Sequence, residues 1–441
     1  MIEKYLVKKI TEPVDWKVTV PGSKSMTNRA LLMAVLSAGT VRVEGVLFSD
    51  DSRHFLACLV ALGFTVEIEE EKKCVTVTGC GGRIPRGEAV IDVGSAGTAA
   101  RFLEAMLGFS DGCYEIRCSA QMKRRPMAEL FDLLSGAGAK ITFLEEEGHL
   151  PVRITGCRYA RADKTAGETP RELSLDITKS TQFLSALLLI APMVPEGMKI
   201  HITSEKTDGS YIRITRKMMQ EFGVSVAFDG RDYEVPCRSS YRKDTYMVEP
   251  DMSAACYFYA AAAVTGGRAL VRHVHMDNTQ GDLRFLEVLE HMGCTADDTP
   301  EGILVTGPAD GALRGITVNM NDFSDQALTL AAIAPFADAP VRIEGIGHIR
   351  GQECDRIHAI QTNLTALGIR CEEEETAATI YPGSPHGGSV ETYDDHRVAM
   401  AFSLVGLRTD GIVIENPACC RKTFENYFTV LSELTGKKME A

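Results

Sequence analysis

The sequence predicts an α/β protein with two domains, each built from three copies of one supersecondary unit. Its 441 residues exceed what one hydrophobic core usually serves, so two domains are expected. A pattern of about 70 residues, with the element order β-α-β-α-β-β, recurs six times along the chain. A proline stands at each expected crossing between the domains, Pro21 and Pro250, and suits a restricted two-strand hinge. We therefore expect one domain at 22–249 and another formed by 1–21 together with 250–441.

Each copy of the repeat opens with small or hydroxyl residues that precede an apolar helix. In the first copy this helix is expected at 27–37, and a β-rich run follows at 41–46. A charged amphipathic helix that ends near a glycine comes next, and a polar hairpin closes the copy. The copies start at Ser25, Ser95, Ser180, Asp251, Ser324 and Asp394, and the charged helices are expected at 51–63, 126–138, 211–223, 283–293, 356–368 and 422–434. The same alternation also fits a single continuous doubly wound sheet, which the pattern alone does not exclude.

Composition and charge exclude several classes of protein. Hydrophobic residues make up 45% of the chain and charged residues 24%, as in ordinary globular proteins. The formal net charge of −13 argues against general nucleic-acid binding, which depends on neutralising phosphates. No uncharged run is long enough to span a membrane, and the first residues lack the pattern of a signal peptide, so we expect a cytoplasmic protein. Thirteen scattered cysteines without ligand spacing predict reduced thiols, with neither disulfides nor a metal site.

Polar residues gather at the starts of the predicted helices. The clearest stretch is Pro21-Gly-Ser-Lys-Ser-Met-Thr-Asn-Arg29, where hydroxyls and two cations lead into an apolar run. A helix N-terminus has free N–H groups and a dipole that favour anions. Comparable residues open other helices: Gly94 to Arg101, Ser180 to Gln182, Asp325, Asp395 to Arg397, Arg124 to Pro126, Glu353 to Arg356, and Arg421 with Lys422. Each alone is more often a helix cap or a solvated charge. If all face one cleft, they predict a site for two polyanionic ligands and an acid–base reaction.

In this order, and over nearly the whole chain, the motifs resemble the 5-enolpyruvylshikimate-3-phosphate synthase family. The residues that carry the resemblance are Pro21-Gly-Ser-Lys-Ser, Arg29-Ala-Leu-Leu, Gly94-x-Ala-Gly-Thr-Ala-x-Arg101, Arg125-Pro126, Ser180-x-Gln-Phe-Leu-Ser, Asn321-Asp-x-x-Asp325, Glu353-x-Asp-Arg356, Asp395-His-Arg and Lys422-Thr-Phe. The resemblance implies two inverse α/β-prism domains, each of three repeats around a central helix bundle. It also implies transfer of the enolpyruvyl group of phosphoenolpyruvate to the 5-hydroxyl of shikimate 3-phosphate, through a tetrahedral intermediate and with release of phosphate. Such an enzyme serves chorismate and aromatic amino acid biosynthesis in the shikimate pathway and is the target of glyphosate.

The resemblance makes domain 22–249 the acceptor side. Arg29 is expected to bind the ring carboxylate of shikimate 3-phosphate, and the hydroxyls of Ser180 and Thr181 its phosphate. Tyr211 would lie against the ring, because its side chain combines a flat apolar face with a polar tip. The full acceptor set that the resemblance implies is Lys24, Ser25, Arg29, Ser180, Thr181, Gln182, Tyr211, Asp325, His348 and Gln352.

The remainder of the chain, 1–21 with 250–441, is expected to be the donor side. The resemblance assigns phosphoenolpyruvate to Lys24, Gly97, Arg125, Arg356, Arg397 and Lys422. Arg356 and Arg397 would bind its carboxylate, and the others its phosphate. Gly97 belongs in this set because a close approach to the backbone leaves no space for a Cβ. No metal or cofactor is implied, since lysines and arginines already neutralise the leaving phosphate.

Three residues are expected to carry the chemistry. Asp325 would take the proton from the attacking 5-hydroxyl, and Glu353, with Lys24, would protonate the methylene carbon and later remove that proton. Glu353 must hold a proton to act as an acid, and the nearby Arg356 opposes this. We expect desolvation on domain closure to favour the protonated acid.

The chain departs from the family pattern at several positions. Gln352 stands where Lys is common and His348 where Asn is common, while Gln121 replaces an Arg and Ser95 an Asn. Asp208 occupies a position where the family has a hydroxyl, which Ser210 could supply instead. These departures place the specificity for the acceptor in question.

Three alternatives remain open at this point. A UDP-N-acetylglucosamine enolpyruvyl transferase shares the fold and donor but has a cysteine five residues before the Arg-Pro arginine, where this chain has Ala120, with Cys118 two places away. A paralogue could use another phosphorylated cyclitol as acceptor. A noncatalytic phosphate-binding scaffold would have no need of Asp325 and Glu353 together. We expect small-molecule substrates, a monomer, and neither nucleic-acid nor membrane partners.

Overall fold

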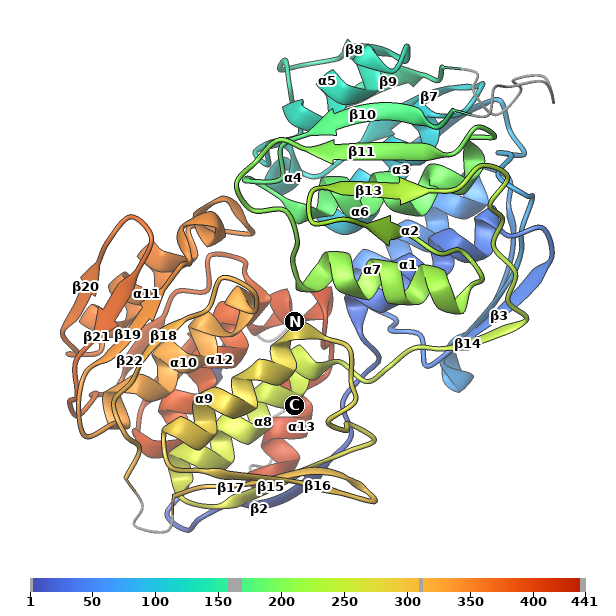
Figure 1. Cartoon of the computed structure of the whole chain (residues 1–441). Coiled ribbons are helices and arrows are strands. Elements are labelled where there is room, and N and C mark those ends of the chain that lie inside the picture. Colours follow the sequence, from blue (N-terminus) through green and yellow to red (C-terminus); the bar gives the residue numbers. More distant parts are fainter. Residues whose placement is uncertain (1–2, 158–168, 309–311, 437–441) are drawn as a thin grey trace. The chain divides into compact units, whose positions relative to one another are not determined.

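The computed structural model describes residues 3–157, 169–308 and 312–436 of the chain (Figure 1). The chain divides into two compact units. Unit 1 consists of Met1–Pro21 with Pro250–Ala441, and unit 2 of Gly22–Glu249. Helices and strands alternate throughout both units, which confirms the predicted α/β class. The sheets are separate within each unit, so the single continuous doubly wound sheet is wrong for this chain.

The described residues of unit 2 form three four-stranded sheets with one common pattern. In each sheet a parallel pair of strands continues into an antiparallel hairpin. The strand orders are β14 (Thr245–Met247), β3 (Thr40–Glu44), β5 (Cys74–Thr78), β4 (Thr65–Glu69); β6 (Glu88–Asp92), β7 (Cys113–Arg117), β9 (Val152–Thr155), β8 (Lys140–Phe143); and β10 (Arg171–Leu175), β11 (Met198–Ile202), β13 (Asp232–Val235), β12 (Ala227–Phe228). This shared pattern is the structural counterpart of the sequence repeat.

Helices fill the interior of unit 2. In α3 (Gly97–Gly108) every residue is buried, and α1 (Lys24–Leu36) and α6 (Thr181–Ile190) are buried along nearly their whole length. A helix that is apolar on all sides must lie in a core. The other helices have one polar face and cover the core: α2 (Asp50–Ala61), α4 (Ala120–Lys123), α5 (Ala128–Gly136) and α7 (Ser210–Glu221), with short 3-10 turns η1 (Glu70–Lys72) and η3 (Ala191–Met193).

Unit 1 repeats this plan with strands from both ends of the chain. Its sheets have the orders β16 (Thr295–Thr299), β17 (Gly302–Thr306), β15 (Arg268–Arg272), β2 (Asp15–Val18); β18 (Thr317–Asn319), β19 (Val341–Glu344), β21 (Ala378–Ile380), β20 (Cys371–Glu373); and β1 (Lys4–Leu6), β23 (Ile412–Glu415), β22 (Gly388–Val390). The buried helices are α8 (Met252–Thr265), α10 (Ala327–Ile333) and α12 (His396–Arg408). The outer ones are α9 (Phe285–His291), α11 (Arg356–Ala366) and α13 (Tyr427–Leu434), with 3-10 turns η4 (Gly281–Arg284), η5 (Ser324–Gln326), η6 (Ala334–Phe336), η7 (Gly347–Gly351) and η8 (Pro417–Lys422). Separate sheets around a helical core are consistent with the prism architecture that the resemblance implies.

Some helix boundaries differ from the expected ones. The helix expected at 27–37 begins at Lys24, because the backbone is already helical directly after the extended Ser23. The helix expected at 422–434 begins only at Tyr427. Pro417 starts a separate 3-10 turn that contains Lys422, since proline fits the first position of a helical turn. The side chain of Lys422 is thereby fixed by a turn and not by a helix.

Candidate functional site

The start of α1 forms the centre of the site residues in unit 2. Gly22 permits the tight entry into the helix, since a Cβ there would lie 1.9 Å from the carbonyl oxygen of Gly45. Lys24 follows, with its Nζ 3.6 Å from Oδ2 of the buried Asp51 in the first turn of α2. No motif in the sequence points to a role for Asp51. In the sequence it is one acidic residue at the start of the charged helix expected at 51–63.

Arg29 is buried where α1, α3, α6 and α7 meet, with only 1% of its surface exposed. Its guanidinium donates to Thr215 Oγ1 at 2.8 Å, to Ser185 Oγ at 3.3 Å, and to the carbonyl oxygens of Ser25 at 2.9 Å and Tyr211 at 3.2 Å. These acceptors are all neutral. Burial lowers the pKa of Arg29 to about 10. A buried cation without a carboxylate partner is a favourable place for an external anion.

Two rings flank this guanidinium. The carbon at its centre lies 5.4 Å from the ring centroid of Phe102 and 5.8 Å from that of Tyr211. Arg29 and Tyr211, two residues of the expected acceptor set, therefore lie together. Phe102 was not singled out in the sequence, where it is one more apolar residue of a core helix.

A second group forms at the N-terminus of α3. Arg101 donates from Nη1 to the carbonyl oxygen of Gly97 at 3.0 Å and to Oε1 of Gln182 at 3.1 Å. A Cβ on Gly97 would lie 2.3 Å from Nη1 of Arg125 and 2.9 Å from Nη1 of Arg101. Because Gly97 has no side chain, the guanidinium of Arg125 can lie close to its backbone. Ser180 uses its hydroxyl to cap α6, accepting from the Gln182 amide at 3.3 Å, and Thr181 is the first residue of that helix.

Unit 1 contains a dense network of ion pairs around Arg356, which is 1% exposed. Arg356 pairs with Asp325 at 3.0 Å, with Glu353 at 3.0 Å and with Asp395 at 2.8 Å. Burial by itself would lower the pKa of Arg356, but the charges of the three carboxylates outweigh it and raise the pKa. The α11 helix supplies the arginine, and its cap residue Asp355 accepts from the His358 amide at 3.0 Å.

Asp325 and Glu353 each bridge two cations. Asp325 joins Arg356 to Arg397 through its second oxygen, which is 2.9 Å from Arg397 Nη2. Glu353 joins Arg356 to Lys422, whose Nζ lies 3.2 Å from Glu353 Oε1. The network therefore brings together both expected catalytic carboxylates and the three expected donor-binding cations of this unit.

Two departures from the family pattern lie beside this network. Gln352 accepts a hydrogen bond from Arg356 Nη1 through its amide oxygen. His348 shares a hydrogen bond of 2.8 Å with Ser324, directly before Asp325. Neither side chain adds a permanent positive charge at its position.

The chemistry of Cys118 bears on the alternative with a reactive loop cysteine. Burial raises the pKa of the Cys118 thiol to about 11, so the thiolate is scarce at neutral pH. Asp208, the other awkward position, pairs with Arg213 at 2.8 Å and accepts from Tyr233 at 3.2 Å.

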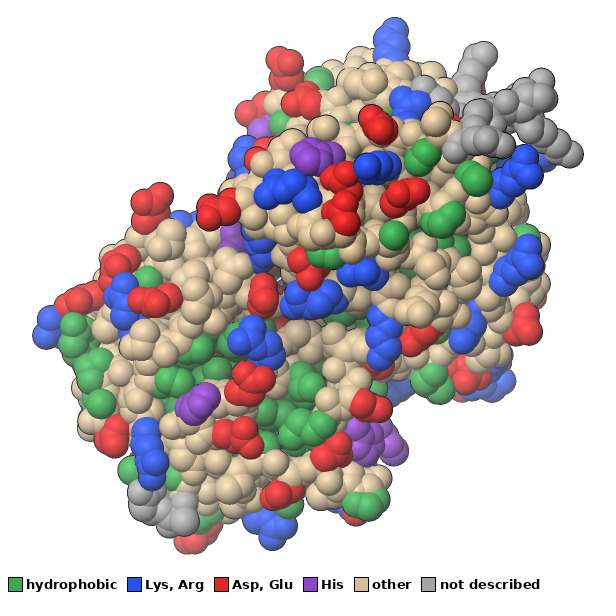
Figure 2. All heavy atoms as spheres, viewed as in Figure 1, with side chains coloured by type: hydrophobic (Ala, Val, Ile, Leu, Met, Phe, Trp, Pro, Cys, Tyr) green, Lys and Arg blue, Asp and Glu red, His purple; other side chains and the backbone are tan. Residues whose placement is uncertain are grey.

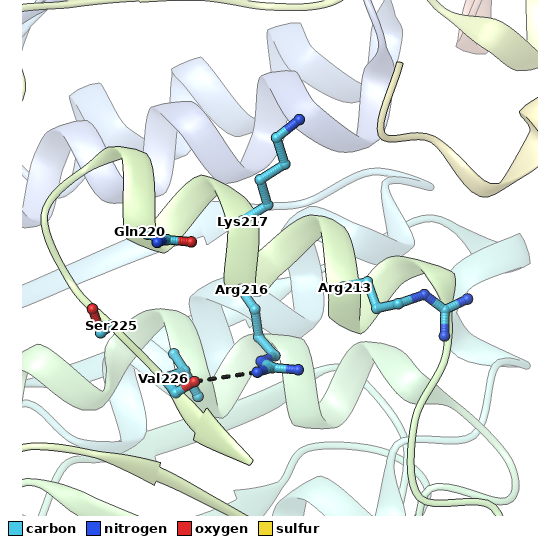
Figure 3. A pocket seen from close by; sticks show the side chains of 6 residues that line it. All are labelled: Arg213, Arg216, Lys217, Gln220, Ser225 and Val226. Carbon is cyan, nitrogen blue, oxygen red and sulfur yellow. Dashed lines mark hydrogen bonds between the residues drawn. The ribbon is translucent and has the colours of Figure 1, made fainter. Parts of the chain in front are cut away.

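A pocket on the outer side of α7 contains several cations but none of the expected site residues. It is lined by Arg213, Arg216, Lys217, Gln220, Ser225 and Val226 (Figure 3). Arg216 donates to the Val226 carbonyl oxygen at 3.4 Å, and Figure 3 shows Lys217 pointing to the opposite side of the helix. These charges diverge and do not form one anion site.

The described residues offer no further class of site. Among them no cluster of three or more His, Cys, Asp or Glu side chains is placed to hold a metal ion. No helix in the described ranges is long and apolar enough to cross a membrane. Basic and acidic side chains are interspersed over the face shown in Figure 2.

Comparisons with known proteins agree on one family. The family model for EPSP synthase (3-phosphoshikimate 1-carboxyvinyltransferase) matches residues 8–431. The 3-phosphoshikimate 1-carboxyvinyltransferase of Trichormus variabilis is 41% identical over 429 residues, which cover 97% of this chain and 98% of that protein. The corresponding protein of Sulfurovum is 39% identical and covers 96% of this chain and 97% of its own length.

Solved structures show the same likeness. An EPSP synthase from Acinetobacter baumannii superposes with a TM-score of 0.79 at 25% identity, covering 99% of both chains. The enolpyruvyl transferase NikO from Streptomyces tendae, at 17% identity, shares the fold with a TM-score of 0.72 over 98% of this chain and 97% of its own.

Proposed function

The chain belongs to the EPSP synthase family, and from this premise we propose that it is a 3-phosphoshikimate 1-carboxyvinyltransferase. It transfers the enolpyruvyl group of phosphoenolpyruvate to the 5-hydroxyl of shikimate 3-phosphate and releases phosphate. The transfer serves the synthesis of chorismate and the aromatic amino acids. The observation that carries the proposal within the structure is the network in which Asp325 and Glu353 each bridge two cations.

The acceptor is bound first by the buried cation of unit 2. Arg29 takes the ring carboxylate, because its hydrogen bonds go only to neutral oxygens and its charge is uncompensated. Tyr211, already against this guanidinium, packs on the ring. Ser25, Ser180, Thr181 and Gln182 bind the phosphate, and Lys24, Asp325, His348 and Gln352 complete the acceptor set.

The donor binds through an exchange of ion-pair partners. Arg356 and Arg397 take the carboxylate of phosphoenolpyruvate, while Lys24, Gly97, Arg125 and Lys422 take its phosphate. Before binding, Arg356 and Lys422 hold Glu353 between them at 3.0 and 3.2 Å. When the donor's anionic groups occupy these cations, Glu353 loses the partners that favour its charged form and can carry a proton.

The two carboxylates then divide the chemistry. Asp325 accepts the proton of the 5-hydroxyl as the oxygen attacks C2 of the donor, and Glu353, with Lys24, delivers a proton to the methylene carbon. This addition gives the tetrahedral intermediate. Loss of a proton from the new methyl group and departure of phosphate restore the double bond, now attached to the acceptor. The cations stabilise the phosphate as it leaves.

We further propose that the protein acts as a monomer in the cytoplasm and without a cofactor. All the residues of the acceptor and donor sets come from one chain. Its thirteen cysteines are free thiols, which suits a reducing compartment.

A test of acceptor use decides the function. Purified protein is mixed with phosphoenolpyruvate and either shikimate 3-phosphate or UDP-N-acetylglucosamine, and free phosphate is measured. We expect release with shikimate 3-phosphate alone. Release only with the sugar nucleotide, or with neither acceptor, would contradict the proposed reaction.

A further inference from the structure

Asp282 is a buried carboxyl group to which the sequence pattern assigns no role. It belongs to η4 and only 7% of its surface is exposed. Its Oδ2 accepts hydrogen bonds from the hydroxyl of Ser253 and from Nε2 of Gln326 at 2.8 Å. These donors come from α8 and η5, so one oxygen joins three elements.

Both donors, Ser253 and Gln326, are adjacent to the ion pair between Asp325 and Arg397. Arg397 Nη2 donates to the Ser253 hydroxyl at 3.4 Å and to Asp325 Oδ2 at 2.9 Å. Gln326 follows Asp325 in the chain. Its amide has one orientation, because Oε1 accepts from the Thr329 hydroxyl at 2.9 Å while Nε2 faces Asp282.

We propose that Asp282 is a positioning residue that holds the Asp325–Arg397 pair through Ser253 and Gln326, and that its charge tunes Asp325 as a base. The inference rests on the proposed function, since it concerns the proton that Asp325 accepts. Asp282 itself touches neither Arg397 nor the substrates in this assignment and acts through its neighbours.

The electrostatics agree with this position. Burial, and then the negative charge of Asp325, raise the pKa of Asp282 to about 6, while Arg397 and the hydrogen bonds from Ser253 and Gln326 oppose the rise. The thiol of Cys256, which also faces Asp282 from α8, has its pKa raised well above the usual value by burial and stays neutral. Repulsion between two carboxylates is reciprocal, so an ionised Asp282 increases the proton affinity of Asp325.

The Asp282→Asn variant separates charge from shape. The amide oxygen can still accept both hydrogen bonds, but the charge is gone. Because the pKa of Asp282 is about 6, its charge is present only above that pH. We expect kcat of the wild type to rise through a step near pH 6, where Asp282 ionises and strengthens Asp325 as a base, and the variant to lack this step. At neutral pH kcat falls, since Asp325 is then a weaker base. Substrate titrations are the same for both proteins and cancel in the comparison.

A matched control and a second variant complete the test. Asp298→Asn removes a carboxylate of the same unit that bonds to His275 and the Met276 amide, and it should leave the step near pH 6 in place. Ser253→Ala removes a donor that favours the ionised Asp282, so it should move the step near pH 6 to higher pH. Thermal unfolding followed by circular dichroism verifies that each variant is folded.

The outcomes are distinct. A folded Asp282→Asn protein that keeps the wild-type step near pH 6 would overturn the inference. If that variant does not fold, Ser253→Ala decides, and a step that stays near pH 6 in it has the same consequence. A wild-type protein that releases no phosphate with shikimate 3-phosphate refutes the proposed function itself.

Discussion

Each unit contains a buried arginine of the site, but the partners of the two guanidinium groups differ in charge. Arg29 in unit 2 and Arg356 in unit 1 are both 1% exposed. Among the described residues Arg29 donates only to hydroxyl and carbonyl oxygens, and burial lowers its pKa to about 10. Arg356 bonds to three carboxylates, whose charges outweigh burial and raise its pKa. No carboxylate among the described residues thus compensates the charge of Arg29 in unit 2, whereas three carboxylates compensate that of Arg356 in unit 1.

The difference indicates two kinds of ligand binding. An anion that reaches Arg29 meets a cation whose desolvation has already taken place on folding, so the ion pair forms without displacing a competitor. An anion that reaches Arg356 must compete with Asp325 and Glu353. In the proposed reaction, this competition couples donor binding to the charge state of the two carboxylates to which we assign proton transfer. Unit 2, in which Arg29 bonds to neutral oxygens, is suited to recognition of an anion. Unit 1, in which the cations are paired with carboxylates, is suited to catalysis.

The largest expected effect follows from removing the carboxylate of Asp325, the proposed general base, from the ion pairs around Arg356. Asp325→Asn should lower kcat by roughly 10²–10⁴-fold, the usual contribution of a general base. The same change removes the carboxylate that competes for Arg356 and Arg397, so phosphoenolpyruvate should bind at least as tightly as to the wild type. Phosphate release measures the first effect and isothermal titration calorimetry the second.

The exposed Asp338, in the same unit, supplies the control for this variant. Asp338→Asn removes a carboxylate that accepts from the Gly315 amide at 2.9 Å, and it should leave both measurements unchanged. Weaker donor binding by Asp325→Asn would mean that the carboxylate organises Arg356 and Arg397 instead of competing with the ligand.

The next effect compares the two arginines directly. Arg356→Met leaves Asp325, Glu353 and Asp395 without a shared cation, and breaking a buried pair in this way costs roughly 3–5 kcal/mol of unfolding free energy. Arg29→Met removes a charge that has no carboxylate partner, so its stability cost should be clearly smaller. Its binding of shikimate 3-phosphate should weaken roughly 10–100-fold, from the 1.5–3 kcal/mol typical of hydrogen bonds to charged groups. Urea unfolding and calorimetry test both variants, and equal losses of stability would contradict the distinction between the units.

The fold could be predicted from the sequence more fully than the site. Apolar helices preceded by hydroxyl residues, followed by strands at a constant spacing, predict the α/β class because each repeat must bury the same face. The helix expected at 422–434 was too long, since the proline at 417 sets a separate turn whose extent depends on packing. The clustering of the site residues within each unit follows from their recurrence at helix starts. Their roles toward substrates stay predictions.

Pairing within the site could not be predicted. Asp325, Arg356 and Asp395 are separated by about 30–40 residues in sequence, and nothing in the local pattern says that one guanidinium bonds to both carboxylates. Asp282 gave no signal, because an aspartate after a glycine in a polar stretch is typical of a turn. Its importance arises from burial and from two hydrogen bonds to distant residues, which exist only in the folded chain.

A smaller effect is expected at Gly97 of unit 2, to which we assign a contact with the donor's phosphate. The methyl group of Gly97→Ala would lie 2.3 Å from Nη1 of Arg125, so this guanidinium must move. The Michaelis constant for phosphoenolpyruvate should rise several-fold, and the inhibition constant for glyphosate, the longer molecule, by more, since specificity is a difference of two affinities. Gly136→Ala, in α5 with nothing within 4 Å of the added methyl, is the control. Equal shifts of both constants would remove Gly97 from the donor site.

The smallest effect concerns a carboxyl group of unit 2 that has no counterpart in the network of unit 1. Glu104 is completely buried one turn after Arg101, and neither of its oxygens has a hydrogen-bond partner among the described residues. Burial raises its pKa well above the usual value, against the opposing charge of Arg101. The unfolded chain ionises this group near its ordinary pKa of about 4.3, so the folded state becomes relatively less stable as pH rises above that value.

Glu104→Gln removes this dependence, because the amide has no charge to suppress. Below about pH 4 the variant should be no more stable than the wild type, where both side chains are neutral. At pH 8 its midpoint of thermal unfolding should be higher by a few degrees, the scale of about 1 kcal/mol in a protein of this size. Glu88→Gln, on the exposed strand β6, should change neither value. Differential scanning calorimetry between pH 4 and pH 9 measures the trend. If the difference in unfolding midpoint between variant and wild type does not grow with pH, Glu104 has an ionic partner in the folded protein. The contrast between uncompensated charges in unit 2 and paired charges in unit 1 would then rest on Arg29 alone.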